Sequence, residues 1–423
     1  MEKLLDFLKK SHSAYHAVAG LTECLKAADY TPLTETEDWD LTPGGKYYVN
    51  RNGSALLAFR LPEESPRGFM IGASHSDRPT FKVKENGALS GSYTRLSTEK
   101  YGGMLMASWL DRPLSVAGRV VVETENGIES RLVDIDRDLL LIPNVAIHLN
   151  RKANEGVALN PATDMLPLMG DKEKEALFWQ ELEKQAGGKI LGHDLYLYVR
   201  QEPTRWGLEQ EYFSAQAIDD LECAWCCTQG FLKAKATDKI PVLCVFDSEE
   251  VGSSSYQGAA SDFLQSTLTR ICGCLNLEEK RQIAGSFMVS ADNGHALHPN
   301  HPELSDSANA PVLGGGVVLK FNANQKYTTD GVSAAVFRKI CQKASVPVQT
   351  YCNRADLPGG STLGNISLSQ VGVPCVDIGL AQLAMHSCFE TAGVQDVEYL
   401  INAMTAFYGT KLEGTPDTGY SIV

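Results

Sequence analysis

The sequence lacks the segments that place a protein in or across a membrane. No apolar run approaches the roughly 18–20 residues needed to span a bilayer, and the amphipathic N-terminus has no charged segment followed by an apolar core. We therefore expect neither membrane insertion nor secretion. Basic residues are also scarce, because 38 Lys and Arg stand against 52 Asp and Glu, and the net charge is −14. No Lys/Arg-rich run is interleaved with aromatic residues, so we expect no nucleic-acid partner.

The cysteines do not form the pattern of a disulfide framework. Their number, 11, is odd, and several lie inside apolar runs such as residues 241–246 (PVLCVF). Reduced, buried thiols are typical of cytoplasmic proteins, so we expect this protein in the cytoplasm. The 423 residues also contain no internal repeat or low-complexity tract. Their number allows about two domains.

Short apolar runs of strand length are what the sequence does contain, and several are followed by acidic residues or histidines. The runs and their polar residues are 68–73 with His75 and Asp77, 241–246 with Glu249 and Glu250, 285–290 with Asp292 and His295, and 371–379 with His386. Near-continuous apolar strands predict a sheet covered on both faces. Helical periodicity in the segments between them, such as 260–269 and 331–341, indicates an α/β protein with a largely parallel or mixed sheet. Sites in such sheets lie at the carboxyl ends of the strands, where these polar residues stand.

One region of the chain reads differently. Residues 85–206 contain long β-rich stretches and one polar helical piece, which predicts a second, β-rich domain. We expect it to be inserted into the α/β domain, whose two parts are then residues 1–84 and 207–423.

The adjacent carboxylates of Glu249 and Glu250 suit a metal site. A multivalent cation can hold one of them as a ligand, while the other takes a proton from metal-bound water. A solvated acidic turn explains the pair equally simply. His75 is followed by Asp77, and an acid at this spacing can hold the second ring nitrogen of a ligand histidine.

Further donors extend this set. Asp219 stands at the expected start of a helix, where it is either a plain N-cap or a ligand whose two carboxylate oxygens bridge two cations. His75 and His386, taken singly, are equally well explained as surface or core-edge histidines. Together, the candidate ligands offer nitrogen and oxygen donors suited to zinc, cobalt or manganese. They are His75, Asp219, Glu250, Asp292 and His386, and Glu249 is left as an unligated base.

The order and spacing of these residues resemble those of the aspartyl aminopeptidase family of metallopeptidases. The motifs are SHSD at 74–77, IDDL at 218–221, DSEEVGS at 247–253, SADNGHALHPN at 290–300 and AMHS at 384–387, with YGGM at 101–104 and SWLDR at 108–112 inside the β-rich region. The resemblance covers nearly the whole chain. It implies an α/β/α catalytic domain of the co-catalytic zinc aminopeptidase type, an inserted β-rich dimerisation domain, and dimers that assemble into a tetrahedral dodecamer.

The resemblance also implies a role for each donor. Asp219 matches the aspartate that bridges two Zn²⁺ ions per subunit, for which Co²⁺ or Mn²⁺ are possible replacements. His75 and Asp292 complete one metal, Glu250 and His386 the other. Asp77 orients His75, and Glu249 is the general base that takes a proton from the bridging water and delivers it to the leaving amine. Ser76 and Asp220 depart from the Thr and Asn that the family often has, but neither change removes a ligand.

The substrate side carries over in the same way. His148 matches a histidine that the family sends into the neighbouring subunit's active site, and an ordinary interface histidine is its alternative. Lys320 matches a basic residue near the substrate pocket, where a cation suits a substrate carboxylate, and a solvated lysine at the end of a strand is its alternative. His295, Tyr327 and Gly360 lie in segments that the family places at the site, Gly360 in a Gly-rich loop without the ending of a P-loop.

The function that follows is hydrolysis of N-terminal residues, preferentially Asp or Glu, from peptides by a di-metal aminopeptidase. The alternatives are a related metal-dependent amidohydrolase or deacylase and an aminopeptidase that prefers Lys or neutral residues. A scaffold protein that has kept only the fold is disfavoured, because every predicted ligand and Glu249 are present.

Overall fold

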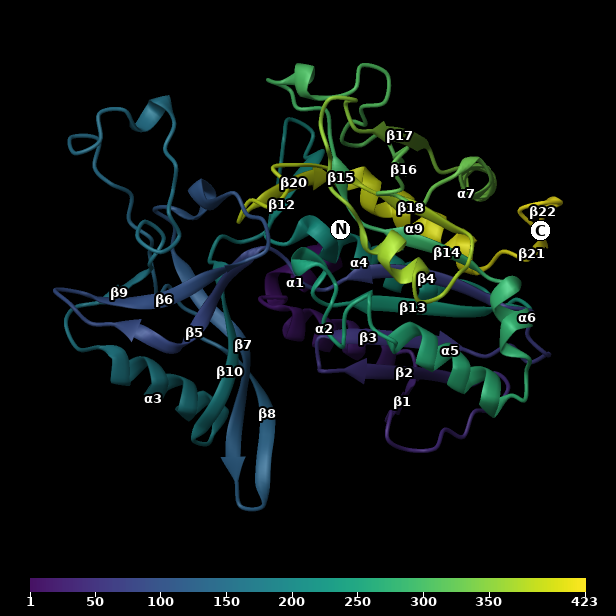
Figure 1. Cartoon of the computed structure of the whole chain (residues 1–423), viewed down its shortest axis with the longest axis horizontal. Coiled ribbons are helices and arrows are strands. Elements are labelled where there is room, and N and C mark those ends of the chain that lie inside the picture. The colour runs from purple at the N-terminus through teal and green to yellow at the C-terminus, as the bar shows by residue number, and fades with distance from the viewer.

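A nine-stranded mixed sheet forms the centre of the larger of two bodies in this computed structural model, which describes residues 1–423 (Figure 1). Its strands, in spatial order, are β1 (Thr31–Leu33), β2 (Lys46–Arg51), β3 (Ala55–Arg60), β13 (Ile240–Phe246), β4 (Phe69–His75), β14 (Phe287–Ala291), β18 (Cys375–Gly379), β16 (Val317–Phe321) and β17 (Val348–Cys352). The four central strands β13, β4, β14 and β18 run parallel.

Helices cover both faces of this sheet, and each face has its own core. One face packs 47 buried residues under α1 (Glu2–Lys10), α2 (Ala14–Lys26), α4 (Ile218–Lys233), α7 (Gly331–Lys343) and α9 (Val394–Tyr408). The other packs 25 buried residues under α5 (Phe263–Cys274), α6 (Glu279–Ala284) and α8 (Leu363–Leu368). Alternate residues of β13 enter opposite cores, Leu243 one and Val242 the other, which is why the strand is apolar throughout. The predicted α/β architecture is confirmed.

A six-stranded antiparallel sheet forms the second body. Its strands, in spatial order, are β8 (Gly127–Asp134), β7 (Leu114–Thr124), β10 (Ile190–Val199), β5 (Thr80–Leu89), β6 (Thr94–Tyr101) and β9 (Leu168–Gly170). Together with α3 (Glu175–Ala186) it encloses a separate core of 20 buried residues. The insertion expected at residues 85–206 overlaps this body, and its limits stay a prediction.

A smaller five-stranded sheet belongs to the first body and carries part of the site. It orders β11 (Thr204–Trp206), β12 (Tyr212–Ala215), β20 (Glu390–Gly393), β19 (Ala381–Leu383) and β15 (Gly294–His295). The chain ends in a hairpin of β21 (Leu412–Thr415) and β22 (Gly419–Ile422). None of the helices combines the length and the hydropathy needed to cross a bilayer.

The two bodies meet along α2, the turn joining β2 and β3, and the hairpin of β7 and β8. At this junction Nδ1 of His12 lies 2.7 Å from Oδ2 of Asp134. The buried Arg78 donates to the backbone oxygens of Ser11 and His12. The long segment between β8 and β9 projects away from both sheets (Figure 1).

Candidate metal centre

The carboxyl ends of three neighbouring parallel strands gather most of the predicted ligands. In the register of β13 and β4, Phe246 pairs with His75, so the turn with Glu249 and Glu250 begins beside that histidine. On the other side of β4, β14 ends at Ala291, directly before Asp292. Asp219 reaches this edge from the first turn of α4, and His386 from the loop between β19 and β20.

The five predicted ligands form two groups that share Asp219. The first triad is His75, Asp219 and Asp292, and the second triad is Asp219, Glu250 and His386. Within each triad the donor atoms lie within 4.8 Å of one another. Nε2 of His75 lies 3.6 Å from Oδ1 of Asp219, and Nε2 of His386 lies 3.4 Å from Oδ2 of the same residue. Each carboxylate oxygen of Asp219 therefore faces a different triad.

Both histidines present the same nitrogen to the cluster. Nδ1 of His75 lies 3.1 Å from the backbone oxygen of Asp77 and 3.3 Å from Oδ1 of the same residue. Nδ1 of His386 faces the backbone oxygen of Gly103, which belongs to the segment following β6 in the second body. An Nδ1–H that donates outward fixes the tautomer and leaves Nε2 as the metal-binding atom.

Three further carboxylates, the inner carboxylates Asp77, Asp220 and Glu390, accept hydrogen bonds from backbone amides of the predicted site residues. Asp77 accepts the amides of Glu249 and Glu250 at 3.0 and 3.2 Å, and also the hydroxyl of Tyr101 at 2.7 Å. Asp220 accepts the amide of His75 at 3.0 Å. Glu390 accepts the amides of Asp219 and His386. The sequence analysis missed Glu390 and this use of Asp220, since no spacing rule connects them to the ligands.

The charge of this cluster is unbalanced toward the negative. Oδ1 of Asp219 and Oε1 of Glu250 are buried and have no hydrogen-bond partner, a costly arrangement unless a cation is bound. Burial lowers the pKa of His386, but Asp219 outweighs it and raises that pKa to about 9. Burial likewise opposes the charged form of His75, yet its carboxylate neighbours raise its pKa above the ordinary value. Nitrogen and oxygen donors that attract positive charge fit a zinc site.

Glu249 belongs to the pocket but to neither of the two triads; with His75 and Glu250 it forms a third group whose donor atoms also lie within 4.8 Å of one another. Burial raises its pKa to about 8; the charges of Asp292 and Asp77 act in the same direction, and His75 opposes them. A carboxylate whose pKa is moved toward neutrality can both accept and return a proton. Ser248, the residue before it, adopts a left-handed φ of 64° without being glycine, and His386 does so at 66°. Such strained positions cluster at functional sites.

A pocket of about 300 Å³ opens above the two triads. Lys320, His295, Tyr327 and Gly360 all line it, as predicted for the substrate side. Nζ of Lys320 donates to Oδ1 of Asp292 at 3.2 Å and to the backbone oxygen of Asn293 at 2.7 Å. Lys320 is the only Lys or Arg among the lining residues, to which Tyr351, Ser361, Thr362 and Met385 also belong.

Two predicted site residues do not line this pocket, since Asp77 contacts His75 and Glu249 from behind, and His148 lies elsewhere. No hydrogen bond or ion pair connects His148 to the pocket. This histidine is exposed in the projecting segment between β8 and β9. Its neighbours are exposed as well, Leu149 to 83%.

An α/β fold that holds two histidine–carboxylate triads beside a further glutamate is typical of a metal-dependent hydrolase. The family model described as "Aminopeptidase I zinc metalloprotease (M18)" matches residues 7–408. The chain therefore belongs to the M18 family of zinc aminopeptidases, which includes aspartyl aminopeptidase, and the resemblance found in the sequence is confirmed.

Curated and solved relatives agree with this assignment. A probable M18 family aminopeptidase 2 of Clostridium novyi is 41% identical over 422 residues, which cover 96% of this chain and 98% of the relative. The structure of Ape4 in complex with Nbr1 superposes with a TM-score of 0.92 at 34% identity, covering 96% of this chain and 85% of Ape4. The S. cerevesiae mApe1 dodecamer gives a TM-score of 0.85 at 26% identity, covering 96% and 95%.

Proposed function

We propose that this zinc aminopeptidase works with two metal ions per subunit and removes N-terminal Asp or Glu from peptides. The observation that carries the two-ion site is the pair of triads sharing Asp219, with one of its oxygens directed at each histidine. Glu249, beside both triads and bound into neither, is the proposed base.

The chemistry divides between the ions and the chain. When bound, two zinc ions would polarise the scissile carbonyl and acidify a water molecule. Glu249 would accept the proton of the attacking water at its carboxylate and return it to the leaving amine. Asp77 holds Glu249 in place through the amide at 3.0 Å.

Lys320 supports the preference for acidic side chains. Its ammonium group has three donors, and Asp292 and Asn293 use two of them. The third remains for a substrate carboxylate. The aromatic ring of Tyr327, 5.5 Å from Nζ, shields that side of the lysine from water.

We also propose that the protein assembles into dimers and a tetrahedral dodecamer, and that His148 acts across a subunit boundary. The dodecamer of a relative with the same fold supports the assembly. The exposed apolar residues around His148 support a contact surface there, since Val145, Ile147 and Leu149 are between 44% and 83% exposed. Mixing inactive Glu249→Gln and His148→Ala subunits should restore part of the activity, and no recovery after verified subunit exchange would refute the trans role.

A cytoplasmic location is the last part of the proposal. All 11 cysteines are free thiols, and most of them are buried. Fractionation of the source cells should place the protein with cytoplasmic markers, and recovery with secreted or membrane markers would contradict this.

The test of the activity is a panel of chromogenic aminoacyl substrates with Asp, Glu, Lys, Leu or Ala, each with and without an N-acetyl group. We expect cleavage that depends on metal, is led by Asp or Glu, and requires a free amine. Cleavage led by Lys or Leu would keep the two-metal chemistry and reject the acidic preference. Cleavage of the acetylated substrates would instead indicate a deacylase.

A further inference from the structure

Glu390 lies behind the two triads, where it contacts the backbone and not the donor atoms. It is the first residue of β20 and is only 2% exposed. Oε2 accepts the amide of Asp219 at 3.1 Å, and Oε1 accepts the amide of His386 at 2.7 Å. One carboxylate thus fixes the backbone of the shared ligand and of a ligand peculiar to the second triad.

A chain of hydrogen bonds connects Glu390 to the other side of the site. Nε2 of Gln382 donates to Oε1 of Glu390 at 3.3 Å. Oε1 of Gln382 in turn accepts Nδ2 of Asn293 at 2.7 Å, and Asn293 directly follows the first-triad ligand Asp292. All three side chains are buried, so water does not replace these bonds easily.

The other two inner carboxylates, Asp77 and Asp220, hold other parts of the site. Asp220 holds the amide of His75, and Asp77 holds those of Glu249 and Glu250. Neither contacts the loop that carries His386, which is held by Glu390, by the backbone oxygen of Gly103 and by the hydroxyl of Ser108, which accepts the amide of Cys388 at 3.0 Å.

We propose that Glu390 is a positioning residue that sets the affinity of the second triad for its metal ion. The inference rests on the proposed two-ion site. Gln at this position has the same shape, but its NH₂ group cannot accept an amide. One of the two backbone N–H groups, that of Asp219 or that of His386, then faces another donor, and only the second triad contains both residues. Losing a partner that orients a ligand typically weakens metal binding about 10–100-fold.

The chain offers a matched control in Asp396. This carboxylate is also buried, and it accepts two backbone amides, those of Gly314 and Gly316 at 2.7 and 2.8 Å. It does not line the metal pocket. Asp396→Asn therefore removes the same kind of contact from the same fold without touching a ligand.

The experiment is a titration of the chelator-treated full chain with Co²⁺, followed by calorimetry and by the visible spectrum. Wild type and Asp396→Asn should each bind two ions. Each ion should bind the variant with the affinity that it has for the wild type. Glu390→Gln should bind one ion as wild type does and the other 10–100-fold more weakly. With one equivalent of Co²⁺, its spectrum should match that of His386→Ala, which keeps only the first triad intact.

The outcomes separate this inference from the function on which it rests. Fewer than two ions in the wild type would reject the two-ion site itself. Two ions in the wild type with unchanged affinities in Glu390→Gln would overturn only the role of Glu390, as would equal weakening in Asp396→Asn. If Glu390→Gln does not fold, Gln382→Met removes one link of the same chain. It should weaken the same ion by a smaller factor, and unchanged binding there overturns the inference.

Discussion

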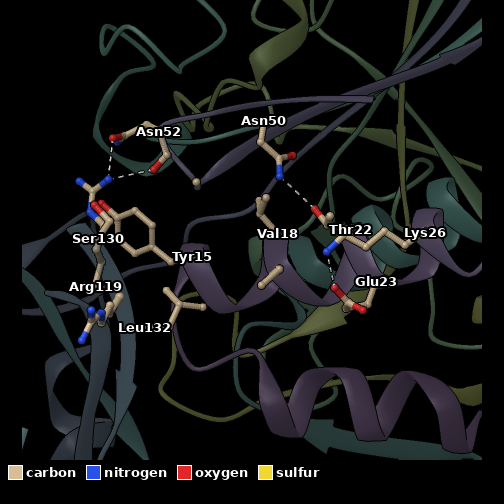
Figure 2. A pocket seen from close by; sticks show the side chains of 13 residues that line it. Tyr15, Val18, Thr22, Glu23, Lys26, Asn50, Asn52, Arg119, Ser130 and Leu132 are labelled. Atoms are coloured by element: carbon tan, nitrogen blue, oxygen red, sulfur yellow. Dashed lines mark hydrogen bonds and ion pairs between the residues drawn. The ribbon is translucent and has the colours of Figure 1, made fainter. Parts of the chain in front are cut away.

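Two hollows in the molecule differ in size and in how their charges are balanced. The larger, the interdomain groove, measures about 490 Å³ and lies between α2, the turn joining β2 and β3, and the strands β7 and β8 (Figure 2). There Arg119 donates to Oδ1 of Asn52 at 2.7 Å and pairs with Asp194 at 2.7 Å, and Lys26 pairs with Glu23. The metal pocket is smaller, at about 300 Å³, yet it holds buried carboxylate oxygens with no partner.

The difference teaches that unpaired buried charge, and not volume, distinguishes the site. A charge removed from water costs free energy unless a partner balances it. In the groove the partners are other side chains of the protein, and the bond from Arg119 to Asn52 joins the two bodies. In the metal pocket the balance has to come from a bound cation. Perturbing the pocket should therefore change activity, and perturbing the groove should change stability.

Metal removal should have the largest effect. Stripping zinc with a chelator should lower kcat/KM by roughly 10⁴-fold or more, since a metal contributes several kcal/mol to the transition state. Readdition should restore it. The melting temperature should fall as well, because ligands that bind only the folded state stabilise it. Rates and melting curves before and after chelation check this. Full activity in chelator would contradict the claim that a bound cation balances the charge of the metal pocket.

Glu249→Gln should follow, with a loss of kcat of about 10²–10⁴-fold. Gln keeps the shape of the side chain and removes only its capacity to take a proton. Because Glu249 is not among the proposed ligands, and Gln keeps one side-chain oxygen in the group with His75 and Glu250, the metal content should equal that of the wild type. Turnover and metal analysis on the same sample test this, and undiminished turnover would refute the proposed base.

Lys320→Gln should lower the preference for Asp over Leu substrates, and not only the overall rate. Removing a charged hydrogen bond to the substrate carboxylate should lower the ratio of kcat/KM for Asp over Leu substrates by about 10–100-fold. The ratio is the informative quantity, because damage to the proposed metal ligand Asp292 should lower both rates alike. Lys326→Gln, at an exposed lysine outside the pocket lining, is the control. An unchanged ratio in Lys320→Gln would show that Lys320 bonds to Asp292 and does not contact the substrate carboxylate.

Arg119→Ala should leave kcat unchanged and lower the free energy of unfolding by about 1–3 kcal/mol. Burial raises the pKa of Asp194, but hydrogen bonds from Lys82 and Arg119 outweigh it and lower that pKa below its ordinary value. The stabilisation is therefore present above the unfolded-state pKa of about 3.9 and is lost as pH falls through the lower folded-state value. Denaturation at pH 7 and pH 3 tests this. A reduced kcat in Arg119→Ala would contradict the expectation that the groove affects stability and not activity.

Lys26→Ala should have the smallest effect, less than about 0.5 kcal/mol. Its partner Glu23 lies three residues earlier on α2, and both side chains are more than half exposed. Denaturant unfolding measures the difference. A loss comparable to that of Arg119→Ala would show that the groove depends on charges that solvent already screens.

The strands that carry the ligands could be predicted because their signal is local. The apolar runs at 68–73, 241–246 and 285–290 overlap the central strands β4, β13 and β14, and the shared direction of these strands brings the following residues together. Tertiary partners could not be predicted in this way. Glu390 is an ordinary strand residue in the sequence, and its place behind Asp219 follows from the pairing of β20 with β12.

Lys320 and His148 illustrate what sequence leaves open. A lysine near the pocket was expected, but its bonds to Asp292 and Asn293 depend on how β16 lies against β18 and the turn after β14. His148 lies on a segment that a single chain leaves exposed, so nothing within one chain assigns it a partner residue. Its role, like the limits of the insertion at 85–206, stays a prediction.

The backbone oxygen of Gly103 has a consequence for any attempt to trim this enzyme. Gly103 and Tyr101 belong to the second body, yet one faces His386 and the other bonds Asp77. A shortened protein that kept the nine-stranded sheet and every ligand would still lose the groups that aim one histidine and anchor the Glu249–Glu250 turn. The site of the larger body is therefore incomplete without the smaller body, and deleting the smaller body should not leave an active minimal peptidase.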